Sequence, residues 1–423
     1  MAVALYLGDV IDAPPLLTDQ RSYDALGARL ITGYGFSFDR GWYPFTQPDQ
    51  PTAHWSFLYS FFIAAVYAVF GPHPLAARLA QAVIGGALLP LMVYLFTRRF
   101  YRAAPLNPAA AKLAAPGVSA ERLALISAGL AAIYFYFVLY AATLMTETFY
   151  ISGLLWLLSN AIALAEQPTV KRGLLLGVSL SVTTLLRQSI LPWAAALIVW
   201  LLWIGWQRGT LGRALRSSVA ALAVLVISIA PFTLRNYAAF GQFLLLNSNA
   251  GYAMFSAQHP MHGWTFRPFD AAPVPPELVG LNEAQLDKEL MQRGIGFVLA
   301  EPGRYLALSL SRIPIYFEFW PTADTSLINN IGRVGSIGLL LPFMLIGGWL
   351  AFRSGGPRAI GGWRAFASSP LALISLFMLV YSALHIFTWA MPRYRLPVDA
   401  VALPLAALAL ARALNWWRTR AAA

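Results

Sequence analysis

Nine apolar segments follow one another along the chain, and they constrain its fold more than any other feature. Most approach the ~20 residues that a helix needs to cross the hydrocarbon core of a bilayer. Only 11% of the 423 residues are charged, against about a quarter in soluble domains. We therefore predict an all-α polytopic membrane protein. The expected spans are residues 76–97, 121–140, 147–165, 173–187, 190–207, 217–234, 333–352, 368–390 and 394–413.

Cationic side chains gather in five connections between these spans, and their positions predict an orientation. The clusters are Arg98, Arg99, Arg102, Lys112 and Arg122; Lys171 and Arg172; Arg208, Arg213 and Arg216; Arg353, Arg358 and Arg364; and Arg412, Arg418 and Arg420. Such clusters mark the cytoplasmic side of a membrane protein rather than a nucleic-acid-binding face. All five share a side only if two apolar, aromatic-rich stretches, 54–70 and 303–320, do not cross. We predict that both are interfacial helices.

This topology gives one transmembrane domain, residues 1–423, with its C-terminus in the cytoplasm. Residues 1–75 form a first extracytoplasmic loop with interfacial helices, and residues 235–332 form a second. Residues 1–75 start on the outer side without a span to carry them there, so we expect that a first transmembrane helix is missing from this chain. The absence of cysteine excludes disulfides and thiolate chemistry. The five histidines lack metal-ligand spacing, which favours structural or interfacial roles.

Asp19 and Tyr23 are candidate functional residues in a polar helical segment near the N-terminus. Their spacing of four places them on one side of a helix, with the aspartate in its first turn. The helix dipole there favours an ionised carboxylate, which is suited to accept a proton from an acceptor hydroxyl. The alternative is that Asp19 is a helix-start residue without a chemical role.

Arg78 and Glu147 are further candidates at the outer ends of spans. Arg78 opens the first full span, where a guanidinium matches the geometry of a phosphate; the alternative is a side chain that snorkels to the interface. Glu147 lies where two spans meet, and a carboxylate at that depth is costly unless it is partnered. Its alternative role is in the first turn of a helix capped by Thr146.

Cations recur at the other outer connections as well, against the positive-inside trend. They are Arg187, Arg235, and the run Arg393-Tyr394-Arg395. This recurrence predicts that something anionic gathers there, and a lipid phosphate or diphosphate is the natural candidate. The aromatic Gly/Pro-rich loop 33–55 is suited equally to stacking on sugars and to anchoring in the interface.

The order of several short motifs resembles that of the GT-C superfamily of membrane glycosyltransferases, in particular its family-39-like branch of protein O-mannosyltransferases and lipid A aminoarabinose transferases. The likeness covers nearly the whole chain. It is carried in sequence order by "TDQRSYDALGARLITGYG", "AHW" with "FGPHPLAARLAQAVIGG", "TLMTE", "LLRQSILP", "PFTLRNYAAFGQF", "LAEPGRYLAL" and "PRYRLPV". The resemblance implies a GT-C bundle of about 9–10 transmembrane helices with interfacial helices and two extracytoplasmic loops.

The resemblance also implies an activity: inverting transfer of a sugar, hexosyl or pentosyl, from a polyprenyl-phosphate donor to a protein, lipid or glycan acceptor. The reaction would take place on the outer face of the cytoplasmic membrane. Asp19 would be the catalytic base, and Arg78 would contact the lipid phosphate. Arg187 and Arg393 would contact donor or acceptor lipid, and Glu147 the sugar or acceptor, with Tyr23 and Tyr394 as neighbouring substrate-binding residues.

Two departures from the family pattern bear on cofactors and completeness. Gln20 stands where the family usually has a second acid, which puts a metal role of that position in doubt. The resemblance permits a divalent metal ion, but the sequence identifies neither a ligand set nor any other cofactor. The expected first transmembrane helix is also absent.

Rival functions fit the sequence less well. A transporter or flippase of polyprenyl-linked glycans would place ionisable residues near the midplane and show repeats or broken helices. Here the charged candidates lie at outer helix ends. A membrane scaffold would not need outer cations beside an aspartate, and the lack of a Rossmann glycine fingerprint argues against a nucleotide-sugar donor.

Overall fold

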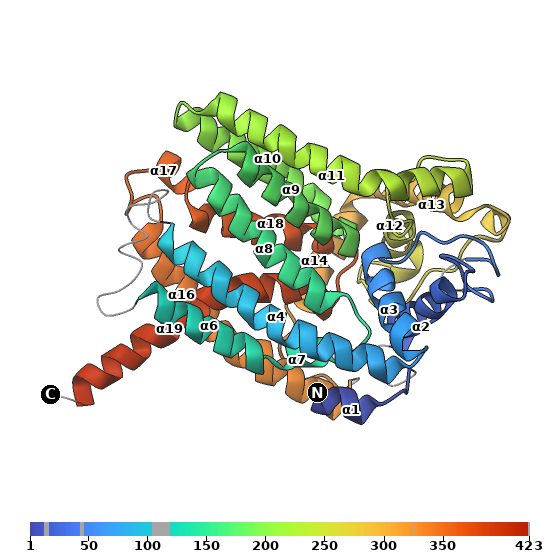
Figure 1. Cartoon of the computed structure of the whole chain (residues 1–423), viewed down its shortest axis with the longest axis horizontal. Coiled ribbons are helices and arrows are strands. Elements are labelled where there is room, and N and C mark those ends of the chain that lie inside the picture. The colour runs from blue at the N-terminus through green and yellow to red at the C-terminus, as the bar shows by residue number, and fades with distance from the viewer. Residues whose placement is uncertain (12–16, 43–45, 104–118, 324, 422–423) are drawn as a thin grey trace.

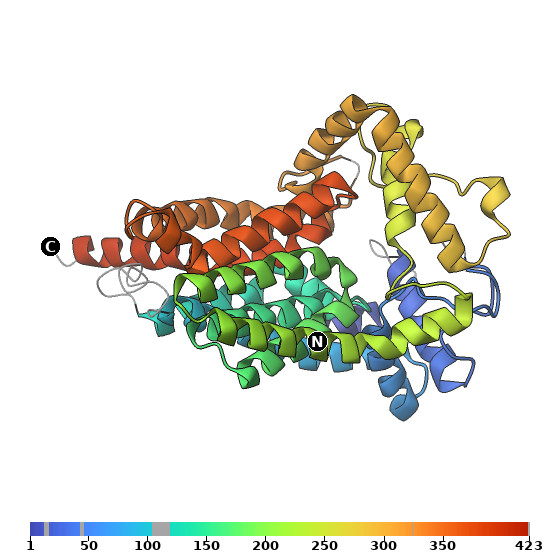
Figure 2. The same ribbon diagram turned by 90° about the horizontal axis from the view of Figure 1, so that it is seen from above.

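Long helices lying side by side make up most of the molecule. The computed structural model describes residues 1–11, 17–42, 46–103, 119–323 and 325–421. A smaller lobe covers one end of the helical bundle (Figure 1). In the perpendicular view, the last turns of the C-terminal helix project from the other end (Figure 2). Strand pairing in the described ranges is limited to two isolated bridges, so the all-α prediction is confirmed.

All nine predicted spans are helical, with ends that differ from the prediction by a few residues. The bundle helices are α4 (Pro74–Arg102), α6 (Ala120–Ile133) with α7 (Phe135–Ala141), α8 (Glu147–Glu166), α9 (Val170–Leu186), α10 (Leu191–Gln207), α11 (Leu211–Phe240), α15 (Leu327–Arg333) continuing through η4 (Val334–Gly338) into α16 (Leu339–Gly355), α18 (Pro370–Phe387) and α19 (Leu396–Ala421). Seven stretches of the described chain are long and apolar enough to cross a membrane. The pair α6 and α7, bent by 63°, makes an eighth if it counts as one span.

The one predicted span not included in this count is α9. It has 17 residues and runs antiparallel to α8 along its length. At one end, Arg187, just after α9, pairs with Glu147, the first residue of α8. At the other end, Arg172 near the start of α9 donates to the backbone carbonyl of Ala163 near the end of α8. The two helices therefore share both ends of the bundle, as successive spans do.

The bundle has two chemically different ends. At one end, Arg99 pairs with Glu166, Arg208 donates to the carbonyl of Ala165, and Arg122 donates to Asn415. All five predicted cationic clusters lie there, except that Lys112 is outside the described residues; we call this the cationic end. The lobe covers the opposite end, the lobe end (Figures 1 and 2). The five cationic clusters therefore lie on one side of the bundle, as the predicted topology requires.

Local signals set many of the helix starts. Ser119, Thr169 and Ser369 each accept a hydrogen bond from the backbone N–H three residues later, at the starts of α6, α9 and α18. Asn282 and Gln285 form a reciprocal capping box at the start of α13 (Glu283–Ala300). These caps satisfy N–H groups that a helix start leaves without intrahelical partners.

The lobe is built from α2 (Leu17–Ile31), α3 (Phe57–Phe70), α12 (Ala250–Gln258), α13 (Glu283–Ala300) and α14 (Pro302–Tyr316). Short elements complete the described helices: α1 (Ala2–Leu7), α17 (Trp363–Ala367), η1 (Gln188–Ile190), η2 (Pro260–His262), η3 (Pro276–Leu278) and η5 (Pro392–Arg395). The buried carboxylate of Glu283 joins the two parts of the lobe, one from residues 1–75 and the other from residues 235–332. It accepts hydrogen bonds from the N–H of Ala53 at 2.7 Å, from Thr46 at 3.1 Å and from Ser248.

The stretches predicted as interfacial helices, 54–70 and 303–320, form α3 and α14. With 14 and 15 residues, each is about 21–23 Å long, shorter than the ~30 Å hydrocarbon core. One face of α14 is buried through Leu308 and Arg312, while Leu306 and Leu310 are exposed on the other. This amphipathic pattern suits a helix lying in the interface, and the interfacial assignment remains a prediction.

A close contact between α16 and α19 yields a stability prediction. A Cβ added to Gly347 would lie 1.8 Å from the carbonyl oxygen of Leu405, whereas one added to Gly348 would meet only the Leu405 Cδ1 at 3.8 Å. We expect Gly347→Ala to lower the free energy of unfolding by about 1–3 kcal/mol through overpacking, and Gly348→Ala to be neutral or stabilising by up to ~1 kcal/mol. Thermal unfolding in detergent measures both variants. Equal stabilities would mean that the helices do not approach this closely.

Candidate functional site

Asp19 and Arg393 meet at the lobe end, although 374 positions separate them in sequence. Asp19 lies in the first turn of α2, as predicted, and Arg393 lies in η5, the turn that leads into α19. The Nη1 of Arg393 is 2.7 Å from Oδ2 of Asp19, and each side chain is about one-fifth exposed. A carboxylate that a chemical step could use is thus present, half-buried and paired with a cation.

Glu147 and Arg187 form a second ion pair at the same end. Their Oε1 and Nη2 atoms are 2.5 Å apart, and Glu147 is 2% exposed. Arg187 also donates through Nε to Thr146 Oγ1 at 2.8 Å. Thr146 makes no side-chain capping bond to α8, because its hydroxyl serves Arg187. The capping alternative therefore fails for Thr146, while Glu147 does lie in the first turn.

The two ion pairs influence one another electrostatically. Burial alone would raise the pKa of the Asp19 carboxyl. The positive charge of Arg393, followed by that of Arg187, outweighs it and holds the pKa below its ordinary value. Asp19 is consequently ionised at neutral pH. Burial, together with the charge of Asp19, raises the pKa of Tyr23, which is therefore a neutral hydroxyl.

Tyr23 links this charged group to the body of the bundle. Its ring packs edge-on against Tyr59 at 4.6 Å and against Trp55 at 5.6 Å between ring centroids. The Tyr59 hydroxyl donates to Gln81 Oε1 at 2.5 Å, and Gln81 donates in turn to the carbonyl of Tyr140 at 2.7 Å. A chain of buried polar and aromatic contacts thus connects Tyr23 to α4 and α7.

Arg78 is buried, but its hydrogen bonds point toward the N-terminal segment. Its guanidinium donates to the carbonyls of Gly8 at 2.6 Å and Val10 at 2.7 Å, and to Gln20 Oε1 at 3.0 Å. The side chain is fully buried, so the snorkelling alternative does not hold. Gln20 also accepts from the N–H of Leu144 at 3.1 Å. Its position is therefore used for a neutral hydrogen-bonding link.

The structure brings together six of the seven predicted site residues: Asp19, Tyr23, Glu147, Arg187, Arg393 and Tyr394. Arg78 is linked to this group through Gln20, the neighbour of Asp19. Arg235 lies elsewhere, where it donates to the carbonyl of Thr52 at 2.7 Å and so braces the first loop.

Several residues near the site were not expected from the sequence. His54 is a titratable neighbour of Asp19, and burial lowers its pKa despite the charges of Glu283 and Asp19. His385 stacks on Tyr394 at 4.7 Å. Scattered single histidines carry no spacing signal, so no sequence pattern identifies them. Arg395 was noted in the sequence, but its buried pairing with Asp399 at 3.0 Å was not anticipated.

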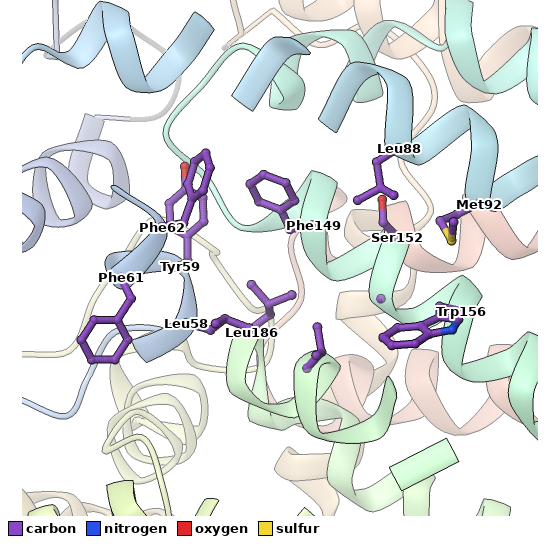
Figure 3. Close-up of a pocket in the computed structure, with 12 residues that line it drawn as sticks. Leu58, Tyr59, Phe61, Phe62, Leu88, Met92, Phe149, Ser152, Trp156 and Leu186 are labelled. Carbon is purple, nitrogen blue, oxygen red and sulfur yellow. The ribbon is translucent and has the colours of Figure 1, made fainter. Parts of the chain in front are cut away.

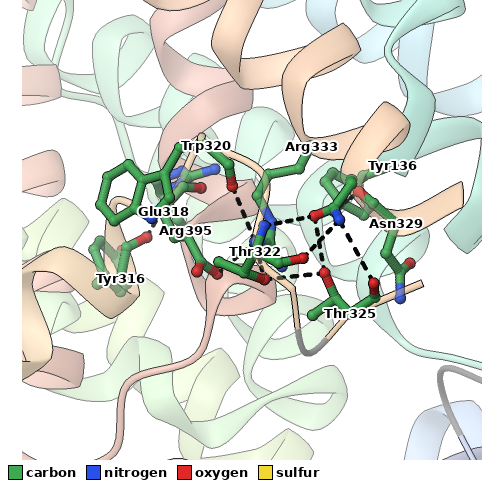
Figure 4. A network of polar contacts seen from close by, with 10 residues as sticks. Tyr136, Tyr316, Glu318, Trp320, Thr322, Thr325, Asn329, Arg333 and Arg395 are labelled. Carbon is green, nitrogen blue, oxygen red and sulfur yellow. Dashed lines mark hydrogen bonds and ion pairs between the residues drawn. The ribbon is translucent and has the colours of Figure 1, made fainter. Parts of the chain in front are cut away.

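A second polar network includes Arg395 of η5 and residues of α15 and of the segment around the end of α14. Arg333 pairs with Glu318 at 3.1 Å and donates to the carbonyl of Trp320, also at 3.1 Å. Arg395 donates to the carbonyls of Tyr316 at 2.8 Å and Glu318 at 3.2 Å. Figure 4 shows these residues converging from the end of α14 and the segment after it, from α15 and from η5. The network fastens the turn that carries Arg393 to the end of the lobe.

An apolar cavity of about 600 Å³ opens beside Tyr59, between α3, α4, α8 and α9. Figure 3 shows aromatic and aliphatic side chains facing the hollow. Its lining is Leu58, Tyr59, Phe61, Phe62, Leu88, Met92, Phe149, Ser152, Gly153, Trp156, Val182 and Leu186. Since Tyr59 also packs on Tyr23, the cavity is next to the charged group. A cavity of this volume can hold a small-molecule ligand or part of a lipid chain.

A metal ion has no evident place in this arrangement. Within the described ranges, no three histidine, aspartate or glutamate side chains gather closely enough to hold one. Asp19 and Glu147 each face an arginine instead. The side chains present fit an anionic ligand better than a cation.

Comparison with known proteins identifies the fold. No protein-family model and no curated protein matches the sequence. Among solved structures, an oligosaccharyltransferase from Archaeoglobus fulgidus, solved with zinc and sulfate, matches with a TM-score of 0.57 and 15% identity over 99% of this chain and 49% of its own. ArnT from Cupriavidus metallidurans, bound to undecaprenyl phosphate, matches with a TM-score of 0.50 and 14% identity over 97% of this chain and 59% of its own.

Both neighbours belong to the GT-C superfamily of membrane glycosyltransferases, so the fold that the sequence resemblance predicts is confirmed. The present chain spans about half to three-fifths of their lengths.

Proposed function

We propose that this protein of GT-C fold is a membrane glycosyltransferase that moves a sugar from a polyprenyl-phosphate donor to a hydroxyl acceptor on a protein, lipid or glycan. One observation carries the proposal: an ionised aspartate with two arginines lies next to an apolar cavity at one end of a membrane bundle. The donor is a lipid joined through a phosphate to a sugar. The cavity suits the lipid, the arginines suit the phosphate, and the aspartate can serve the acceptor hydroxyl that attacks the sugar. The undecaprenyl phosphate in ArnT supports the choice of lipid.

The proposed reaction uses each group in a defined role. The acceptor hydroxyl gives its proton to an Asp19 oxygen while its own oxygen attacks the anomeric carbon. The bond between that carbon and the phosphate oxygen breaks, and polyprenyl phosphate leaves with the bonding electrons. Arg393 and Arg187 stabilise the negative charge that develops on the phosphate. Attack opposite the leaving group inverts the anomeric centre, and the prenyl chain occupies the cavity.

Orientation and donor class are further parts of the proposal. The cationic end faces the cytoplasm by the positive-inside rule, which places the site on the outer face of the cytoplasmic membrane. The donor sugar is a hexose or a pentose. Residues 1–75 and 235–332 are the two extracytoplasmic loops, since both contribute to the lobe.

A direct assay tests this function. Purified protein in liposomes would be incubated with radiolabelled polyprenyl-phosphate sugars and membrane extracts, and the label followed into protein, lipid and glycan fractions. We expect label to move from donor to an acceptor. The rival function, a flippase, predicts that a fluorescent polyprenyl-linked glycan changes leaflet without loss of its sugar. Leaflet exchange without transfer would overturn the proposal.

The cavity makes its own prediction. Leu88→Trp should fill part of the space between α4 and α8 and raise the KM for a long-chain donor by about tenfold, since the loss of several apolar contacts costs more than 1 kcal/mol. The KM for a short-chain donor should change little. Leu91→Trp is the matched control, because Leu91 is half-exposed on the same helix and does not line the cavity. If both variants behave alike, the cavity does not hold the lipid.

A further inference from the structure

Arg393 is held by more than its ion pair with Asp19. Its guanidinium carbon lies 5.2 Å from the ring centroid of Tyr394. The Tyr394 ring stacks on His385 at 4.7 Å and 24°, and the His385 ring faces that of Tyr316 at 6.1 Å and 19°. Tyr394, His385 and Tyr316, here called the ring column, thus extend from Arg393 into the protein, away from Asp19.

The far end of the ring column is fixed in place. Tyr316 is fully buried, and its carbonyl accepts a 2.8 Å hydrogen bond from Arg395, which pairs with Asp399 one turn further along. The hydroxyl of Tyr134 donates to Asp399 at 2.7 Å. Figure 4 shows Arg395 beside Tyr316 and Glu318. Buried charges at membrane depth are costly unless they are paired, so this anchor restrains both Tyr316 and the turn that carries Arg393.

His385 is the central member of the column, and it is fastened on a second side. Its ring lies in the last turn of α18, from which the chain leads on to η5. The ring of Tyr381 packs edge-on against it at 4.9 Å. The ring contacts that hold His385 are thus with Tyr394, Tyr316 and Tyr381.

We propose that His385 is a positioning residue, which acts through Tyr394 to hold the Arg393 guanidinium against Asp19. An arginine side chain has many rotamers, and a flat, fixed surface beside it limits them. Without the His385 ring, Tyr394 loses its support and Arg393 spends less time at Asp19. The expected effect on sugar transfer rests on the proposed function. The positioning of Arg393 against Asp19 does not depend on that function.

The charge state of Asp19 reports the position of Arg393 directly. The titratable or charged groups that act on Asp19 or respond to its charge are Arg393, Arg187, His54 and Tyr23, and Arg393 supplies the largest lowering of its pKa. An opposite charge at this distance lowers a carboxyl pKa by about 1–3 pH units. Partial displacement of Arg393 should therefore raise the pKa of Asp19 by about one pH unit, since the carboxyl remains buried.

The experiment follows the Asp19 carboxyl by infrared difference spectroscopy during a pH titration of the full-length protein in detergent. Asp19→Asn identifies the band. We expect His385→Ala to raise the pKa by about one pH unit, and His385→Phe, which keeps a flat ring, to leave it near the wild-type value. An unchanged pKa in His385→Ala would overturn the proposal. So would equal shifts in both variants, which would indicate that His385 carries a proton rather than supporting a ring.

Two further variants keep the test decisive. Phe96→Ala removes a fully buried ring from α4, distant from the column, and should leave the pKa of Asp19 unchanged. If His385→Ala does not fold, Tyr316→Leu and Tyr316→Phe test the far end of the column: the leucine variant should raise the pKa, and the phenylalanine variant should not. Equal results for these two would also overturn the proposal.

Sugar transfer gives an independent readout. We expect His385→Ala to lower kcat by about tenfold or more with the KM for the acceptor unchanged, and His385→Phe to stay within about threefold of wild type. If wild-type protein transfers no sugar from any polyprenyl phosphate, the proposed function fails, and the infrared titration still decides the role of His385.

Discussion

We expect Asp19→Asn to lower the kcat of sugar transfer by about 10²–10⁴-fold, while the protein remains folded. An amide cannot accept the acceptor's proton, and general-base catalysis contributes rate factors of this size. The variant should keep its donor affinity, because Arg393 and Arg187 are still present and Arg393 is released from its carboxylate partner. Transfer of label from a radiolabelled donor, with unfolding temperature as the folding check, measures the result.

The matched control is Asp49→Asn. Asp49 also pairs with an arginine, Arg29, at 2.5 Å, but its side chain is 67% exposed. Its backbone has a positive φ of 55°, which asparagine tolerates. We expect wild-type activity from this variant. Full activity in Asp19→Asn, or equal losses in the two variants, would remove Asp19 from the role of base.

The pH dependence of transfer follows from the same ion pair. Because Arg393 holds the pKa of Asp19 below its ordinary value, the base stays ionised as the pH falls from neutral, and activity dependent on it persists until the pH reaches that low pKa. Arg393→Gln removes the main lowering charge but leaves the burial that raises the pKa. The acid limb of the pH profile should therefore move upward in this variant.

Arg187→Met is expected to destabilise the protein by about 3–5 kcal/mol, because it leaves the carboxylate of Glu147 buried without its cation. Glu147 is 2% exposed, whereas Arg187 is 18% exposed. Glu147→Gln should therefore cost less than Arg187→Met, since the arginine that remains is nearer to water. Thermal or denaturant unfolding in detergent measures the difference.

The double variant Glu147→Met with Arg187→Met separates stability from function. Replacing both members of a buried ion pair with apolar residues is often neutral or stabilising, so most of the lost stability should return. Donor binding should not return, because the phosphate still lacks one of its two cations. A double variant that binds polyprenyl phosphate with unchanged affinity would show that Arg187 does not contact the donor.

Sequence reasoning reached the spans and the charged residues because both leave local signals. Apolar length identifies a span such as α8, and a cation at the wrong end of a span draws attention to Arg187 or Arg393. The pairing of Asp19 with Arg393 is different, since it joins residues at opposite ends of the chain. Sequence spacing holds no information about a contact across 374 positions.

Arg78 and His385 illustrate the same limit. Both are single residues whose role depends on what the fold places next to them. Arg78 has the chemistry of a phosphate ligand, but the carbonyls of Gly8 and Val10 occupy its donors in this structure. His385 acquires a role only because Tyr394 and Tyr316 stack beside it. For such residues, tertiary packing decides between several uses that the side chain allows.

The two ion pairs have a consequence for turnover. Asp19, Glu147, Arg187 and Arg393 sum to zero charge, and a donor phosphodiester adds one negative charge. The proposed transfer would keep this total but relocate it: Asp19 would become neutral and the leaving phosphate would gain a second negative charge. The arginines then hold the spent lipid more firmly than they held the donor. Its departure is assisted when Asp19 gives its proton to water and competes again for Arg393, so recharging of the aspartate and exit of the lipid are linked steps of the cycle.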